Sequence, residues 1–138
     1  MREYLGHLAA ADPLHGYLRD AILPQLVQAE QEPRFRVYRV SAESAVYLYE
    51  DKWTEVRVVG KFYARARGLN GSNAPQSAEN ERRSLEYARN LGLDAPPDYV
   101  ARPLGVREDL GDLLVVEHLA GEQLDAIVAA AATAGLGD

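Results

Sequence analysis

The chain of 138 residues contains no cysteine, no long apolar run and no excess of positive charge. Without cysteine it can form neither a disulfide framework nor a zinc site with thiolate ligands. Its most apolar segment, 126–134, is too short and too rich in alanine to span a bilayer. The net charge of −6 argues against nucleic acid as the main partner, because phosphate backbones require clustered positive charge.

The sequence does contain enough apolar material for an ordinary core. Hydrophobic residues make up 47% of the chain and charged residues 26%, which argues against wholesale disorder. The length fits one domain, or part of one. Residues 1–14 lack the basic region and the apolar run of a signal peptide. We therefore expect a cytoplasmic protein that has no membrane partner.

Residues 1–30 are predicted to form a helical extension in front of the main domain. Asp12 followed by Pro13 is typical of a helix N-cap with proline in the first turn. Pro24 is expected to end or kink this helix. Apolar residues recur between these points at helical spacing, at Leu14, Leu18, Ile22 and Leu26.

From Phe35 onward the periodicity changes to that of strands, and later back to that of a helix. The predicted strands cover 35–41, 45–51, 55–64, 99–106 and 112–117. Helices are predicted over 77–91, ended by Gly92, and over 123–133. The expected fold is α+β, a five-stranded antiparallel sheet with one packed helix, preceded and followed by a helix. The expected divisions are 1–30, 31–122 and 123–138.

One residue of the third predicted strand is unusual for its position. In the segment V-R-V-V-G-K-F-Y, residues 56–63, alternation places Val59, Lys61 and Tyr63 on one face, with Arg57. A lysine within so apolar a strand is costly to bury unless a partner compensates its charge. The alternative is a lysine at the strand end whose ammonium group reaches water.

Glu81 is the expected partner of Lys61. It shares one face of the predicted helix with Leu85, Ala88 and Leu91, which places a carboxylate on a buried stripe. The two charges could approach to about 2.7–2.9 Å in a fully formed charge-assisted hydrogen bond. In an isolated lobe, where no nucleotide or second lobe holds the helix, the alternative is a displaced helix and a longer distance. The alternative for Glu81 is a solvated carboxylate in the first turn, where it interacts favourably with the helix dipole.

These segments, in this order, resemble the amino-terminal, ATP-binding lobe of the protein-kinase-like fold, in the aminoglycoside phosphotransferase and choline kinase branch. The resemblance covers roughly residues 35–127. It is carried by V-V-G-K-F-Y (58–63), E-R-R-S-L-E-Y-A (81–88) and L-L-V-V-E-H-L-A-G-E-Q-L (113–124). It implies the nucleotide-binding lobe of an ATP-dependent small-molecule phosphotransferase, with ATP as the cofactor.

The resemblance gives phosphate-binding roles to individual positions. Lys61 would hold the α- and β-phosphates of ATP, and Glu81 would position that lysine. The loop from Ser41 to Ser44 would cover the phosphates. This loop departs from the family, because it contains no glycine and because Glu43 would repel a triphosphate.

Adenine contacts follow from the same resemblance. Val46 and Val59 would form the apolar ceiling over the base, and Val116 would precede the hinge. Glu117 and Leu119 would offer backbone carbonyl and amide groups to the adenine edge. His7, His15 and His118 do not cluster in the sequence, and we predict no metal site from them.

The larger departure concerns catalysis. The family's catalytic aspartate, the asparagine after it and the magnesium-binding aspartate lie in a carboxy-terminal lobe, which is expected to be missing from this chain. The chain alone is therefore predicted to be inactive. The alternative is a non-catalytic binding or assembly module built on the same lobe.

The expected partners are a nucleotide and either the missing lobe or a second copy of this chain. Without that lobe an apolar surface would be uncovered. It comprises Val46, Val59, Val116 and Leu119, with Leu124, Ile127 and Val128 of the last helix. Because monomers rarely expose such patches, a symmetric dimer is expected. The alternative is that helix 123–133 folds back over the surface.

Overall fold

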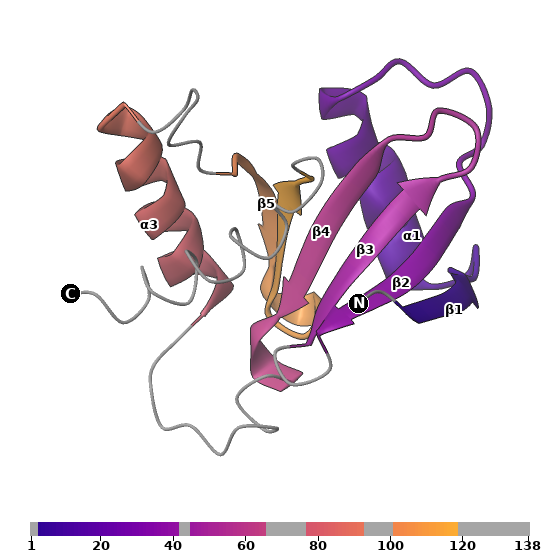
Figure 1. Cartoon of the computed structure of the whole chain (residues 1–138). Coiled ribbons are helices and arrows are strands. Elements are labelled where there is room, and N and C mark those ends of the chain that lie inside the picture. Colours follow the sequence, from indigo (N-terminus) through magenta and orange to yellow (C-terminus); the bar gives the residue numbers. More distant parts are fainter. Residues whose placement is uncertain (1–2, 42–44, 66–76, 93–100, 119–138) are drawn as a thin grey trace.

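A computed structural model of the protein describes residues 3–41, 45–65, 77–92 and 101–118. They form an α+β fold around a six-stranded antiparallel sheet with the strand order β1-β2-β3-β4-β6-β5 (Figure 1). The strands are β1 (Glu3–His7), β2 (Phe35–Ser41), β3 (Val46–Asp51), β4 (Arg57–Phe62), β5 (Pro103–Arg107) and β6 (Leu113–Glu117). No helix in these ranges is both long and apolar enough to cross a membrane.

Strands β2 to β6 lie where alternation of apolar residues predicted them, although β4 and β5 are shorter than expected. Residues 99–100 of the fourth predicted strand are outside the described ranges. The predicted number of five strands is wrong, because β1 adds a sixth strand at the edge of the sheet.

Strand β1 also corrects the prediction that residues 1–30 are helical. It pairs with β2, and the ring of Tyr4 lies 5.4 Å from that of Tyr38. The register shifts between Tyr4 and Gly6, which marks a β-bulge. Gly6 has a φ of 110°, a left-handed conformation that an α-helix does not use. A strand this short offers too little periodicity to be recognised in the sequence.

The helical part of the N-terminal segment is short and irregular. It consists of α1 (Pro13–Tyr17), one wide π-helical turn, η1 (Leu18–Ile22), and one 3₁₀ turn, η2 (Leu23–Gln25). The predicted cap is confirmed, since the Asp12 carboxylate accepts a hydrogen bond of 2.9 Å from the Leu14 amide. Pro24 falls in the last turn, where the helical stretch ends. The predicted apolar stripe is buried at Leu14, Leu18 and Ile22.

This segment packs on one face of the sheet, which we call the α1 face. Its core is formed by side chains of the N-terminal segment and of alternate strand positions, among them Leu18, Ile22, Phe35, Tyr47, Tyr49, Val58, Leu113 and Val115. Two further contacts hold the segment on β5. Gln25 Nε2 donates a hydrogen bond of 2.8 Å to the Leu104 carbonyl, and the Arg107 guanidinium lies 5.0 Å from the Tyr17 ring centre.

Helix α3 (Ala78–Asn90) packs on the opposite face, which we call the α3 face, and lies mainly on β5 and β6 (Figure 1). Ser77 caps it by accepting a hydrogen bond of 3.2 Å from the Asn80 amide, and Gly92 follows its end at a φ of 100°. The core of this face contains Val46, Leu48, Val59, Tyr63, Ala78, Leu85, Ala101, Leu114 and Val116.

The alternation predicted for β4 is confirmed, because Val58 belongs to the core of the α1 face and Val59 to that of the α3 face. On α3 the predicted buried stripe is confirmed for Glu81 and Leu85 but is wrong for Leu91, which is 66% exposed. Leu91 is the C-cap residue, so the buried face ends before it. Ser44, Leu119 and the predicted helix 123–133 lie outside the described residues.

Candidate functional site

Lys61 lies within β4, at the middle of the sheet. Its register partners are Val46 on β3 and Leu114 on β6, so two buried apolar residues flank it. It shares the α3 face with Val59 and Tyr63, as alternation requires. Lys61 is the last residue but one of β4, and it has a ladder partner on each side.

Glu81 is buried on α3, with 3% of its surface exposed, and it interacts electrostatically with Lys61. Burial lowers the pKa of the Lys61 ammonium group, and the negative charge of Glu81 acts in the opposite direction. The predicted hydrogen bond between them is not formed, since no Lys61 Nζ to carboxylate oxygen distance within the described residues is 4.0 Å or less. Helix α3 packs mainly on β5 and β6, beside β4 rather than over it.

Tyr63 completes this group, and the sequence reasoning assigned it no role. It is 1% exposed, and the Lys61 ammonium lies 4.7 Å from its ring centre. Burial raises the pKa of Tyr63, and the charges of Glu81 and Asp112 raise it further. Its hydroxyl is buried and has no hydrogen-bond partner within the described ranges. The alternation that places Tyr63 beside Lys61 was the available signal.

Apolar side chains predicted to cover adenine lie next to Lys61 on the same face. Val59 is the register partner of Leu48 on β3 and of Val116 on β6. Val46, Val59 and Val116 are exposed by only 1%, 3% and 6%. The structure thus brings these three residues together as a buried apolar row.

The predicted hinge is partly occupied by contacts within the protein. The backbone amide of Glu117 donates a hydrogen bond of 3.0 Å to the Arg102 carbonyl, so this donor is already used within the protein. Its carboxylate accepts a 3.0 Å hydrogen bond from the Arg102 amide and lies 3.8 Å from Arg89 of α3. Ser41 ends β2.

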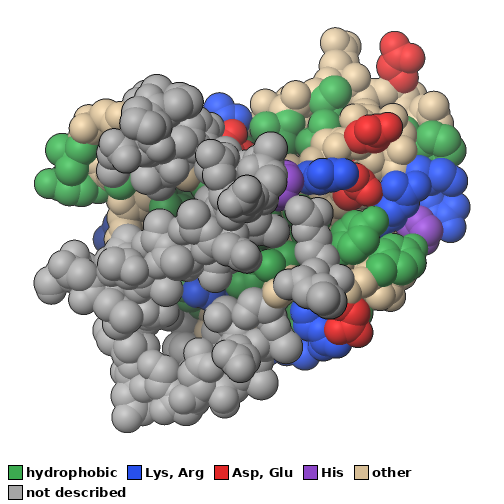
Figure 2. All heavy atoms as spheres, in the orientation of Figure 1, with side chains coloured by type: hydrophobic (Ala, Val, Ile, Leu, Met, Phe, Trp, Pro, Cys, Tyr) green, Lys and Arg blue, Asp and Glu red, His purple; other side chains and the backbone are tan. Residues whose placement is uncertain are grey.

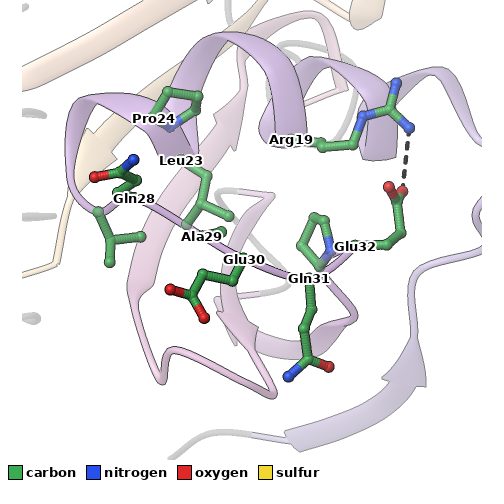
Figure 3. Close-up of a pocket in the computed structure, with 10 residues that line it drawn as sticks. Arg19, Leu23, Pro24, Gln28, Ala29, Glu30, Gln31 and Glu32 are labelled. Carbon is green, nitrogen blue, oxygen red and sulfur yellow. Dashed lines mark hydrogen bonds and ion pairs between the residues drawn. The ribbon is translucent and has the colours of Figure 1, made fainter.

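A separate pocket of about 600 Å³ lies in the N-terminal segment (Figure 3). Leu23 and Val27 belong to its lining and also pack into the core of the α1 face, so the pocket is remote from Lys61. Arg19 points toward Glu32, which its Nη1 contacts at 3.1 Å, and its Nε contacts Asp20 at 2.8 Å. The Arg19 guanidinium group is thus already paired with the carboxylates of Asp20 and Glu32.

The described residues contain no group of three or more His, Asp or Glu placed to hold a metal ion. Compared with protein-family models, with curated proteins and with solved structures, the chain shows no match. Its chemistry must therefore be argued from the site itself. A partly buried cation, a buried carboxylate and a buried phenol lie near one another beside an apolar row, and such a combination suits an anionic group attached to a flat apolar one.

Proposed function

We propose that this chain is the nucleotide-binding lobe of an ATP-dependent small-molecule phosphotransferase, similar to aminoglycoside phosphotransferases. One observation carries the proposal. Lys61 on β4 and the buried Glu81 on α3 share one face of the sheet and interact electrostatically, although both are expensive to bury. Groups kept in such positions against their solvation energy are candidates for function.

The arrangement of the elements supports the same proposal. The helix that carries Glu81 follows the strand that carries Lys61, and the chain then returns as β5 and β6. Strand β6 pairs directly with β4, the strand that carries Lys61, and Val116 of β6 lies opposite Val59 of β4. This is the order that the resemblance to the amino-terminal kinase lobe requires.

In this proposal Lys61 binds the α- and β-phosphates, and Glu81 keeps the ammonium group charged and directed toward them. Val46, Val59 and Val116 contact the base. The phenol of Tyr63 provides a second hydrogen-bond donor near the phosphates. The bound nucleotide supplies the phosphoryl group, and Glu117 and Leu119 lie along the hinge.

Transfer also requires a metal-held phosphate and a positioned nucleophile. The resemblance assigns both to residues of a carboxy-terminal lobe. We therefore expect this chain alone to bind ATP weakly and to transfer no phosphoryl group.

A second candidate function is a non-catalytic binding or assembly module. The burial of Val46, Val59 and Val116 favours it, because an adenine ring could reach them only if the groups that cover them moved. The engagement of the Glu117 amide by Arg102 favours it as well.

Calorimetric titration with ATP and magnesium separates the two candidates. The chain contains two lysines, Lys52 and Lys61, which makes Lys52→Met a matched control for Lys61→Met. We expect weak binding by the wild type, about tenfold weaker binding by Lys61→Met, and no change in Lys52→Met. Equal affinity in all three proteins, or no binding by the wild type, would exclude the nucleotide-binding proposal and leave the assembly module.

A further inference from the structure

Basic side chains gather at one end of the sheet, where β2 and β4 begin and β3 ends. We call Arg34, Arg36, Lys52 and Arg57 the basic patch. In the sheet register Glu50 lies opposite both Arg36 and Arg57, and the Lys52 amide donates a 2.8 Å hydrogen bond to the Arg34 carbonyl. Figure 2 shows Lys and Arg side chains around a histidine at the right of the view, over the start of β2.

Glu50 orients the two arginines of the patch. Its side chain is 8% exposed and accepts hydrogen bonds of 3.1 Å from Arg36 Nη1 and 2.7 Å from Arg57 Nε. Burial raises the pKa of Glu50, but these hydrogen bonds outweigh it and hold the pKa below its ordinary value. Each guanidinium has five N–H donors, so both arginines, 36% and 44% exposed, keep donors for a partner.

The local charge is positive, in contrast to the chain as a whole. The pKa of His7 lies below its ordinary value; burial is the largest cause, followed by the positive charges of Arg34, Arg36 and Lys52. The neighbouring Asp51 is 0% exposed, and its carboxylate accepts hydrogen bonds from the Arg34 amide and from Thr54. In the adjoining turn Glu55 is an exposed carboxylate.

An exposed aromatic side chain adjoins these cations. Trp53 is 49% exposed, and the Lys52 ammonium lies 4.8 Å from its ring centre. Tryptophan and arginine are the residues that most often dominate the energy of protein interfaces. A surface that combines oriented guanidinium groups with an accessible indole therefore fits a partner with both carboxylates and an apolar side chain.

We propose that the basic patch docks a short acidic peptide segment of a partner protein, with carboxylates on Arg36 and Arg57 and an apolar side chain on Trp53. Charge complementarity selects this partner, because the net charge of −6 repels a long polyanion such as nucleic acid but affects a short segment much less. The proposal is independent of nucleotide binding at Lys61.

The test uses the intrinsic fluorescence of Trp53, the single tryptophan of the chain. The probe is the acetylated, amidated peptide Glu-Glu-Leu-Glu-Glu, and the comparison peptide carries Gln at every Glu. We expect a saturable change with the acidic peptide, none with the neutral one, and about tenfold weaker binding at high salt. Equal binding of both peptides, or no binding, overturns the proposal.

Charge reversal locates the site. Arg34→Glu combined with Lys52→Glu leaves both hydrogen bonds to Glu50 in place, so the fold is retained, and about tenfold weaker binding is expected. Arg83→Glu, at a residue 72% exposed on α3, is the matched control for Lys52→Glu alone, because each of these single variants changes the net charge by two, and Arg83→Glu should bind as the wild type does. Equal loss in both variants would mean non-specific attraction and contradict the proposal. Tighter binding of oligothymidylate, lost in the double variant, would reassign the patch to nucleic acid.

Discussion

The two faces of the sheet bury very different chemistry. The α1 face is covered by Leu18, Ile22 and their neighbours, which form a continuous apolar core with the tyrosines of β3. The α3 face is also largely buried, but its interior includes Glu81 and the partly buried Lys61. Apolar burial of the first kind stabilises the fold directly, whereas burial of charge opposes it.

This contrast distinguishes apolar residues that stabilise the fold from charged residues whose presence packing does not explain. The charges of Lys61 and Glu81 would be easy to replace by apolar groups if packing were their only purpose. The α1 face also buries a polar side chain, His15, which is 2% exposed and contacts Phe35; it donates a 2.9 Å hydrogen bond from Nε2 to Glu32, and its Nδ1 has no hydrogen-bond partner within the described residues. The nucleotide site proposed above lies on the α3 face, and the larger apolar core lies on the α1 face.

Substitutions on the two faces should differ most in their effect on stability. Leu18→Ala removes a side chain that is 1% exposed and should lower the free energy of unfolding by about 2–5 kcal/mol. Lys61→Met keeps the length of the side chain and removes a charge that burial disfavours, so it should change that energy by less than about 1 kcal/mol. Urea unfolding measures both. A larger loss for Lys61→Met than for Leu18→Ala would contradict this division of roles.

Gly105 tests how the N-terminal segment is held on the α1 face. A Cβ atom at this position would clash with the Tyr17 hydroxyl and would lie 3.0 Å from Ile22 Cδ1. Gly105→Ala must therefore displace at least the Tyr17 side chain and crowd the buried Ile22, and we expect a loss of about 1–3 kcal/mol. Thermal unfolding measures it, and faster proteolysis between α1 and η2 would locate the displacement.

Gly16→Ala is the matched control for this substitution. Gly16 lies in α1, and the nearest atom to an added Cβ is Arg19 Nη2 at 3.8 Å. Alanine is the better helix former, so this variant should be as stable as the wild type or slightly more stable. If both variants behave alike, the contact at Gly105 does not hold the segment.

The smallest effect concerns the titration of Lys61. Its pKa in the folded protein lies below the ordinary 10.5, so the unfolded chain binds more protons between the two values. The charge of Lys61 therefore opposes folding at neutral pH, and this opposition disappears as the pH rises toward 10.5. Glu81→Gln removes the charge that supports the ammonium group and should lower the pKa of Lys61 further. NMR titration of ¹³C-methylated lysines measures this, with Lys52 as the internal reference, and an unchanged Lys61 signal would show that the two groups are not coupled.

Most of the sheet could be predicted from the sequence, since alternation fixes both the existence of a strand and the face of each residue. It placed Val58 and Val59 on opposite faces. The spacing of Leu14, Leu18 and Ile22 likewise indicated which residues of the N-terminal segment are buried.

Other features depend on packing that a local pattern does not contain. The edge strand β1 is stabilised by pairing with β2, and Gly6 adopts a conformation that only the bulge explains. The helix predicted after Pro13 divides into turns of three kinds because its residues adapt to the sheet beneath them. The separation of Lys61 and Glu81 depends on where α3 lies, which no spacing within the sequence determines.

The pairing of β4 with β6 has a consequence for the route by which the chain folds. Strands β2, β3 and β4 pair with their neighbours in the sequence, as do β5 and β6, whereas Lys61 and Leu114 are register partners although α3 lies between them in the chain. The entropy cost of closing the loop between β4 and β6 must be met before the contacts between these strands can stabilise the fold. We therefore expect the two parts of the sheet to form early and the pairing of β4 with β6, beside Lys61, to form last. A nucleotide that binds beside Lys61 would then bind only chains in which β4 and β6 have already paired.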